Sequence, residues 1–128
     1  MEDQRNCPFC ADRLNERIVE KRGTAIAIED RYPVTRHHML VMPRRHTPDF
    51  FTMTSQERRD AEDLIVLMKN RILEKDPSVT GFNVGVNCGG SAGQTVMHAH
   101  IHLIPRRKGD TPLPRGGVRG VIPEKMAY

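Results

Sequence analysis

The sequence predicts an α+β fold that combines one long helix with a mainly antiparallel sheet. Three observations predict it: short apolar runs early in the chain, a helical repeat in the middle and alternating apolar residues after it. Strands, a helix and further strands in this order are typical of the class. The 128 residues suffice for one core, so we expect a single domain over residues 1–128 with an irregular tail from about residue 109.

The predicted helix starts near Ser55, where Thr54 and Glu57 can form a capping box. Asp76 and Pro77 end it. Between these ends, apolar residues recur at helical spacing: Ala61, Leu64, Ile65, Met68 and Ile72. This spacing indicates a helix with one apolar face.

The segments on either side of the helix are predicted to be strands. Before it, residues 24–29 and 39–42 are apolar runs bounded by turn residues, as in buried strands, and residues 30–35 form a tight connection. After it, residues 82–87 alternate between apolar and polar, which predicts a strand with one apolar face. A glycine-rich loop, residues 88–93, comes next, and a further strand should follow it.

The composition narrows the classes of function. Lys and Arg number 20 against 16 Asp and Glu, a net charge of +4 that suits an anionic small molecule as well as a polynucleotide. Only 5% of the residues are aromatic, so platforms for stacking bases are few and we expect no stable nucleic-acid complex. No apolar run approaches the roughly 20 residues of a membrane span, and the first residues are polar, which predicts a cytoplasmic protein without a membrane span.

Three of the six histidines, His98, His100 and His102, lie close together and alternate with apolar residues. In a strand they would share one face, with the apolar residues toward the core. The row suits two chemistries, and the plain alternative is a half-exposed polar edge. Imidazoles bind metals, although a straight row needs further ligands to close a tetrahedral site. A neutral imidazole can also attack phosphorus when neighbouring groups fix its tautomer.

The loop before the histidines favours the phosphorus chemistry. Gly93 and two further glycines allow backbone N–H groups to approach an anion closely. Gln94 and Thr95 add donors, and residues 106–108 add positive charge. A glycine-rich loop alone is weak evidence, but its position directly before the histidines makes the combination stronger.

Residues 93–104 resemble the signature of the histidine triad nucleotide-binding family, in the form of its bacterial or archaeal dinucleoside polyphosphate hydrolases. Residues 30–43 resemble the family's strand–turn–strand, and Asn87 stands seven residues before Gln94, as in the family pattern. With the central helix, the resemblance covers nearly the whole chain. It implies an antiparallel sheet of about five strands per subunit and a homodimer with a continuous sheet.

The resemblance also implies roles for the histidines. His100 would be the nucleophile that attacks the α-phosphate and becomes nucleotidylated, and His98 and His102 would orient and polarise. Gln94 would hydrogen-bond near the bond that is cleaved. The implied activity is hydrolysis of a nucleoside phosphate derivative, such as a dinucleoside polyphosphate or nucleoside phosphoramidate. Nucleotidyl transfer, phosphorolysis and a non-catalytic regulatory module are the alternatives.

Further positions match the family's nucleotide pocket. Asp30 resembles the acidic residue that binds the ribose hydroxyls, and its alternative role is that of an ordinary turn residue. His38 and Asn87 match the pocket edge, although His38 could instead fill a strand end and Asn87 could cap the loop. Thr95 and Val96 would offer backbone groups to the phosphate.

Cys7 and Cys10 form half of a zinc site. A branch of the family completes such a pair with a histidine after the second strand and the first histidine of the triad, here His46 and His98, which implies structural zinc. His37 is an alternative ligand. The cysteines could instead be packed as small apolar residues, and a redox pair is weakly supported because no strand precedes it.

The C-terminal tail resembles that of bacterial members of the family, where it lies close to the substrate end of the dimer. Arg115 and Arg119 could therefore contact leaving phosphates or a second nucleoside. The alternative is plain surface charge.

Overall fold

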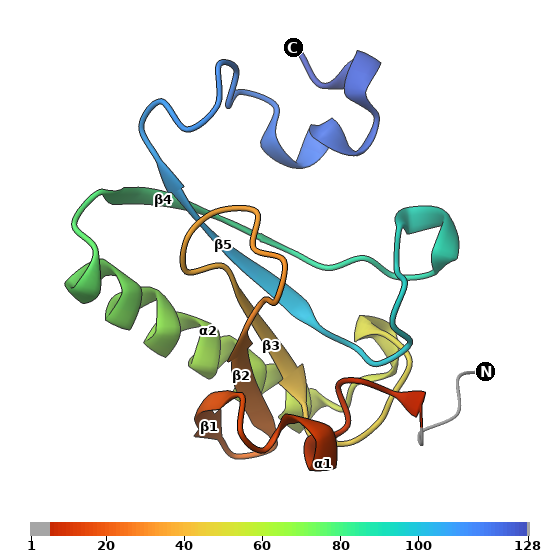
Figure 1. Ribbon diagram of the computed structural model, residues 1–128. Helices are drawn as coiled ribbons and strands as arrows, with labels where there is room; N and C mark the ends of the chain where they lie inside the picture. The colour runs from red at the N-terminus through yellow and green to blue at the C-terminus, as the bar shows by residue number, and fades with distance from the viewer. Residues whose placement is uncertain (1–5, 128) are drawn as a thin grey trace.

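The computed structural model describes residues 6–127, which form a five-stranded antiparallel sheet with the long helix α2 along one face (Figure 1). The strand order is β1-β2-β3-β5-β4. The elements are α1 (Ala11–Leu14), β1 (Ile18–Arg22), β2 (Ala25–Glu29), β3 (Met39–Pro43), α2 (Ser55–Lys75), β4 (Val79–Gly85) and β5 (Ile101–Arg107). The predicted α+β class is confirmed.

Helix α2 begins and ends where the sequence predicts. The Thr54 hydroxyl accepts the Glu57 N–H at 3.0 Å, and the Glu57 carboxylate accepts the Thr54 N–H at 2.8 Å, which completes the capping box. Asp76 caps the other end. The helix buries these apolar side chains against the sheet: Ala61, Leu64, Met68 and Ile72. They belong to the first of two hydrophobic cores, which the helix shares with the sheet.

The N-terminal segment covers the opposite face of the sheet. Five buried residues form this second core: Leu14, Ile26, Ile28, Leu40 and Met42. Strands β2 and β3 are covered on both faces, and for this reason residues 24–29 and 39–42 read as continuous apolar runs. The same packing brings the segment that carries Cys7 and Cys10 onto the sheet.

Strand β1 has no apolar run, and the sequence did not predict it. It lies at one edge of the sheet and, among the residues that the structure describes, pairs only with β2. Gly23 lies in the turn between them, with φ of +55°. The position requires glycine, because a Cβ there would lie 2.5 Å from a carboxylate oxygen of Asp60. That carboxylate accepts the Thr24 N–H at 2.8 Å and the Thr24 hydroxyl at 2.7 Å, so α2 holds the hairpin in place.

Strands β4 and β5 differ in detail from the prediction. Strand β4 is the other edge of the sheet and leaves Val84 49% exposed, so the single apolar face expected over residues 82–87 is only partly formed. Strand β5 begins at Ile101. His98 and His100 therefore precede the strand and do not continue a straight row along it.

As far as residue 127, the glycine-rich loop and the tail contain 3₁₀ turns as their only regular structure. One turn spans Gly90–Ala92 in the loop that leads to β5. The tail forms two more, Gly117–Val121 and Pro123–Lys125, and the first of them contacts β4 (Figure 1). The tail is thus irregular, as expected.

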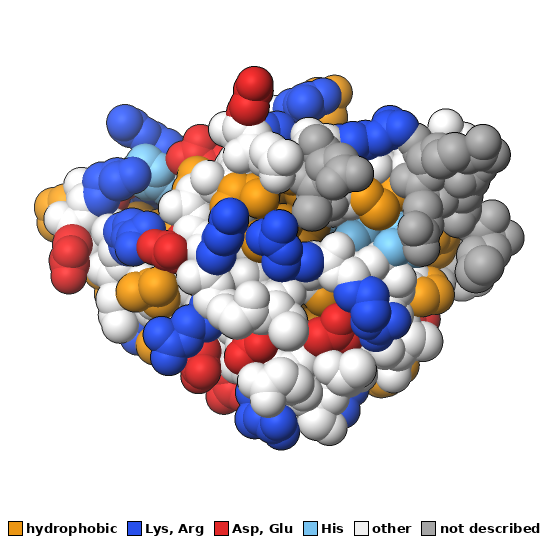
Figure 2. Space-filling view, turned by 90° about the horizontal axis from the view of Figure 1, so that it is seen from below, with side chains coloured by type: hydrophobic (Ala, Val, Ile, Leu, Met, Phe, Trp, Pro, Cys, Tyr) orange, Lys and Arg blue, Asp and Glu red, His pale blue; other side chains and the backbone are white. Residues whose placement is uncertain are grey.

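The surface mixes charges of both signs. Figure 2 shows Lys and Arg side chains interspersed with Asp and Glu on the face drawn, without a continuous basic stripe. Within residues 6–127, no helix has both the length and the apolar character that a membrane crossing requires.

Candidate active site

A pocket of about 370 Å³ opens beside the start of β5, and we call it the histidine pocket. Seven residues that the sequence marked as site candidates line it: Asp30, Asn87, Gly93, Thr95, Val96, His100 and His102. They come from the turn after β2, from the segment between β4 and β5, and from the start of β5. Six lining residues were not predicted: Pro8, Phe9, Arg17, Arg31, Tyr32 and Leu40.

His100 is held in one tautomer. Its Nδ1 lies 2.8 Å from the His98 carbonyl oxygen, which can only accept, so Nδ1 carries the proton and Nε2 carries a lone pair. Burial lowers the pKa of His100 below its ordinary value, although the hydrogen bond to His98 and the charge of Asp30 raise it in part. The ring is therefore a neutral nucleophile near pH 7.

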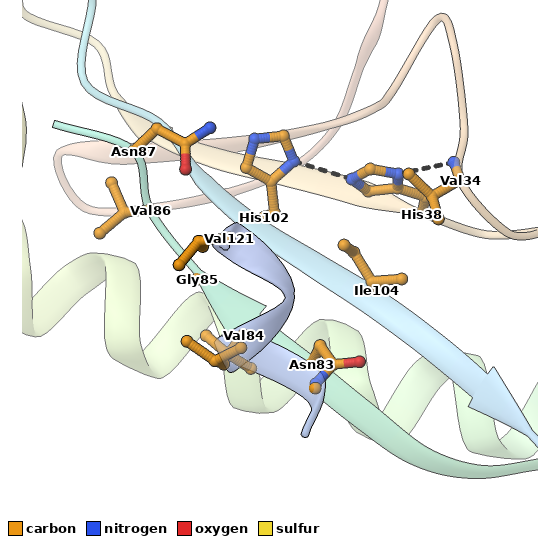
Figure 3. A pocket seen from close by; sticks show the side chains of 12 residues that line it. Val34, His38, Asn83, Val84, Gly85, Val86, Asn87, His102, Ile104 and Val121 are labelled. Atoms are coloured by element: carbon orange, nitrogen blue, oxygen red, sulfur yellow. Dashed lines mark hydrogen bonds between the residues drawn. The ribbon is translucent and has the colours of Figure 1, made fainter. Parts of the chain in front are cut away.

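His102 and His38 form a hydrogen-bond relay (Figure 3). The Val34 N–H donates to His38 Nδ1 at 3.0 Å, so His38 carries its proton on Nε2, which donates to His102 Nδ1 at 2.9 Å. His102 must then carry its own proton on Nε2. Burial, followed by the positive charge that His100 and His38 would carry if protonated, lowers the pKa of His102 to about 4. Its Nε2–H is a neutral donor.

Asp30 lies beside His38 and His102, but the three residues do not form a metal site. Its Oδ2 lies 3.4 Å from His38 Nε2 and 4.0 Å from His102 Nδ1. Such a trio of ligand atoms resembles a site with two histidines and one carboxylate. His38 cannot serve as a ligand, however, because its Nδ1 accepts the Val34 N–H and its Nε2 is protonated.

Asp30 has both of the roles that the sequence left open. Its Oδ1 accepts the Tyr32 N–H at 2.8 Å, as in an ordinary turn. It also lines the histidine pocket, with its side chain 15% exposed. The carboxylate can therefore still accept from a ligand.

His98 does not share a face with His100 and His102, which corrects the prediction of one histidine face. Its ring is fully buried, and its Nε2 donates to the Pro43 carbonyl at 2.8 Å. The physical reason is that the strand starts at Ile101, so the alternation of a strand does not extend back to His98. Its contact with His100 is made by the backbone carbonyl.

The Nδ1 of His98 faces the two N-terminal cysteines. It lies 3.5 Å from Cys7 Sγ and 3.9 Å from Cys10 Sγ, and Cys10 Sγ lies 3.4 Å from His46 Nδ1. All four ligand atoms lie within 4.8 Å of one another. Tetrahedral zinc, with bonds of about 2.3 Å to sulfur and about 2.05 Å to nitrogen, would separate sulfur from nitrogen by about 3.6 Å. The four residues fit zinc.

His37, the alternative ligand, lies elsewhere. Its Nε2 is 3.8 Å from the carboxylate of Asp76, at the end of α2. Its backbone has φ of +73°.

Gln94 is placed differently from the expectation. Its side chain is 5% exposed and does not line the histidine pocket. Its Oε1 accepts the Gly89 N–H at 2.8 Å, and its Nε2 donates to the carbonyls of Pro48 at 2.6 Å and Val96 at 3.0 Å. The amide therefore braces the loop, and Asn87 occupies the pocket wall.

Phe9 is a pocket residue that the sequence analysis missed. It stands between Cys7 and Cys10, and its ring centroid lies 5.0 Å from that of His100 in an edge-to-face arrangement. With Leu40 it gives the pocket an apolar wall. The sequence signal that could have identified it is an aromatic residue between two cysteines that are predicted to pack near the histidines.

A second pocket of about 380 Å³ adjoins the first, and we call it the valine groove (Figure 3). His102 and Asn87 line both pockets. The remaining lining residues come from the turn before β3, from β4 and β5, and from the tail: Val34, His38, Asn83, Val84, Gly85, Val86, Ile104, Gly117, Val118 and Val121. Neither Arg115 nor Arg119 lines either pocket, and Arg119 donates to the Lys125 carbonyl at 2.9 Å.

Comparison with known proteins adds to this geometry. The HIT domain family model matches residues 12–109. An uncharacterized HIT-like protein of Mycobacterium tuberculosis is 36% identical over 110 residues, which are 81% of this chain and 74% of that protein. A Zn-bound histidine triad family protein from Mycobacterium smegmatis superposes with a TM-score of 0.75 at 29% identity, covering 85% of this chain and 81% of that one.

The chain spans less than half of the length of two further relatives. An asymmetrical bis(5′-nucleosyl)-tetraphosphatase of Schizosaccharomyces pombe is 37% identical over 78 residues, 61% of this chain and 42% of that protein. The nitrilase and fragile histidine triad fusion protein of Caenorhabditis elegans is 44% identical over 80 residues, 61% of this chain and 18% of that protein.

Proposed function

Because the chain belongs to the HIT domain family, we propose that it is a nucleotide hydrolase that cleaves at the α-phosphate of a nucleoside phosphate derivative. A nucleotidyl-His100 intermediate carries the reaction. The observation that supports this most is the fixed tautomer of His100, whose Nδ1–H is bound to the His98 carbonyl at 2.8 Å and whose Nε2 lone pair is free to react.

In the first step, His100 Nε2 forms a bond to the α-phosphorus and the bond from phosphorus to the leaving group breaks. The Nε2–H of His102 donates a hydrogen bond to the atom that leaves, and the relay from His38 keeps that proton on Nε2. In the second step, water attacks the same phosphorus and the P–N bond breaks. The leaving group takes up one proton from solvent and the attacking water releases one, so the products are a nucleoside monophosphate, the protonated leaving group and neutral His100.

The rest of the histidine pocket suits a nucleotide. Phe9 and Leu40 offer an apolar wall to the base, and the Asp30 carboxylate can accept the ribose hydroxyls. Thr95 and Val96 line the pocket, and within residues 6–127 no hydrogen bond uses their backbone N–H groups. These two donors would bind phosphate oxygens.

We further propose that Cys7, Cys10, His46 and His98 hold zinc. The ion would act as a structural crosslink between the N-terminal segment, the end of β3 and the segment before His100. Support comes from the four converging ligand atoms and from the orientation of His98, whose Nε2 donates to the Pro43 carbonyl while its Nδ1 faces both sulfur atoms.

A homodimer is also part of the proposal. Within residues 6–127, strand β4 pairs with β5 alone and leaves its other edge open, where a second copy could extend the sheet. Light scattering of the purified protein should give twice the mass of one chain. A monomer at micromolar concentrations would contradict this.

The covalent intermediate is the decisive test of the enzymatic proposal. Acid-free rapid quench followed by mass spectrometry should find a nucleotide adduct on His100. His100→Ala should lose turnover by about three or more orders of magnitude and still bind nucleotide. A variant that keeps most of its activity, or inversion of configuration at phosphorus, would remove His100 as the nucleophile.

Product analysis with and without inorganic phosphate separates hydrolysis from phosphorolysis and nucleotidyl transfer, because all three share the first step. A regulatory module that only binds nucleotide would show no adduct and no turnover.

A further inference from the structure

We propose that Arg17 determines which base the histidine pocket accepts, and that it selects guanine over adenine. This inference rests on the proposed function, since it concerns the nucleotide that binds at the same site. Derivatives of guanosine and inosine 5′-phosphate are the class of substrate that fits.

The two ends of the histidine pocket indicate where the base lies. One end adjoins the valine groove, because His102 and Asn87 line both spaces. The other end adjoins a hollow of about 360 Å³ between the start of β1 and the turn after β2, because Arg17, Asp30 and Arg31 line both spaces. In the proposed reaction the α-phosphate lies at the histidine end. The ribose and base therefore extend past Asp30 toward Arg17.

Arg17 is held at the pocket edge while most of its hydrogen-bond donors stay available. It lies directly before β1, and its side chain is half-buried. Its Nη2 donates to the Glu29 carbonyl at 3.0 Å. A guanidinium has five N–H donors, and this is the one hydrogen bond that the group makes among residues 6–127. The bond fixes the side chain and leaves the other donors for a ligand.

Guanine is the base whose edge matches a guanidinium. Its O6 and N7 are neighbouring acceptors that two N–H groups of one arginine can bind together. Adenine also has N7, but it carries an amino donor where guanine has O6, so this amino group would face the donors of the arginine. Hypoxanthine presents the same O6 and N7 as guanine, and we expect the pocket to accept it equally.

The other lining side chains offer adenine little compensation. Among the described residues that line the pocket, Asp30 has the only carboxylate, and it faces the ribose in the proposed complex. Phe9 and Leu40 cover the faces of the base, where all purines are alike. Discrimination between purines therefore depends on the edge of the base.

Arg31 is the second cation of the pocket. Its side chain is exposed, and within the described part of the chain no ion pair holds it. A side chain without a fixed orientation attracts a nucleotide through its charge but selects weakly between hydrogen-bonding patterns. We therefore assign the choice of base to Arg17.

Calorimetric binding of nucleoside monophosphates to the wild-type protein tests this choice without turnover. Guanosine and inosine 5′-monophosphate should bind about tenfold more tightly than adenosine 5′-monophosphate, as expected for one bidentate arginine contact. 7-Deazaguanosine 5′-monophosphate, which lacks N7, should lose several-fold in affinity. Equal affinity for the guanosine and adenosine compounds, full affinity for the 7-deaza compound, or an inosine compound that binds as weakly as the adenosine compound would each overturn the proposal.

Substitutions test the assignment to Arg17. Arg17→Ala should lower the affinity for guanosine 5′-monophosphate to that for the adenosine compound, whose own affinity should change little. Arg17→Lys keeps the charge but cannot form the paired contact, so it should also lose most of the preference. Arg13→Ala is the matched control, because Arg13 is an exposed cation on α1 that does not line the histidine pocket.

Two results with these variants would overturn the assignment. An equal loss of affinity for both nucleotides in Arg17→Ala would indicate a general effect of charge or folding. A preference that is kept in Arg17→Ala but lost in Arg31→Ala would assign the choice of base to the other cation.

Turnover of guanosine and adenosine 5′-phosphoramidate by the same preparations separates this inference from the proposed function. Cleavage of both compounds with equal affinity for the two bases refutes the choice of base while the hydrolase stands. No cleavage, together with a guanine preference that depends on Arg17, leaves the choice of base standing while the hydrolase fails. Neither cleavage nor preference refutes both.

Discussion

Replacing Gln94 tests whether its amide braces the glycine-rich loop or contacts the substrate. The side chain is 5% exposed and makes three hydrogen bonds, to the Gly89 N–H and to the Pro48 and Val96 carbonyls. Each such bond contributes about 1 kcal/mol net, so Gln94→Ala should lower the free energy of unfolding by about 3 kcal/mol. With an unfolding entropy of about 2.1 cal/mol/K per residue, a chain of 128 residues should lose about 11 °C in Tm.

Gln94→Glu refines this expectation. Its carboxylate can still accept the Gly89 N–H but cannot donate to either carbonyl, so most of the loss in Tm should remain. Gln56→Ala is the matched control, because Gln56 is exposed and its amide donates to the Asp60 carboxylate and accepts from Arg59, both on the same helix. We expect a shift of a few degrees at most there.

Scanning calorimetry and nucleotide turnover measured on the same preparations decide between the two roles of Gln94. A brace predicts a large fall in Tm, with loss of phosphate affinity as a consequence of the displaced loop. Unchanged Tm together with a sharp fall in kcat would refute the brace and restore the expected contact with the reacting phosphate.

The remaining predictions concern the cysteine cluster and the buried histidines. Removing zinc with a chelator, or the Cys7→Ser substitution, should lower both Tm and the affinity for adenosine monophosphate, because Phe9 packs against His100 from between the two cysteines. Cys88→Ser lies outside the cluster and should change neither quantity. Full nucleotide affinity in Cys7→Ser would contradict the link between the cluster and the pocket. Burial lowers the pKa of His102 from about 6.5 to about 4, so between these two pH values the unfolded chain binds more protons than the folded chain. The free energy of unfolding should therefore fall as the pH drops from about 6.5 to about 4. Urea titrations at several pH values should show a shallower fall for His102→Gln, and identical slopes for the two proteins would be the contrary result. The pKa of His100 is lowered as well, so the acid limb of kcat/KM should have an apparent pKa below 6.5.

The elements that depend on neighbours a few residues away were predictable from the sequence. The Thr54–Glu57 capping box and the apolar spacing after it specify α2, because both interactions lie within one or two helical turns. The runs over residues 24–29 and 39–42 were recognisable because β2 and β3 are buried on both faces. The histidines, and the family resemblance of the segment that contains them, indicated where the site lies.

The tertiary structure alone decided how the site residues divide their roles. Alternation in sequence shows which residues would share a face of a strand but not where the strand starts, and β5 starts only at Ile101, where pairing with β3 begins. The His98 ring therefore turns to the cysteines while its carbonyl orients His100. The same limit applies to Gln94, whose three partners are fixed only when the loop has folded.

Strand β1 and the valine groove also depend on contacts between distant segments. Strand β1 is an edge strand with three charged residues, and its pairing with β2, rather than an apolar pattern, holds it in the sheet. The groove combines the turn before β3, the ends of β4 and β5 and the tail, segments up to about ninety residues apart in the chain. Local patterns determined the other elements and the chemistry of their residues. The packing of distant segments decided which side chains meet, because that depends on the free energy of the whole fold.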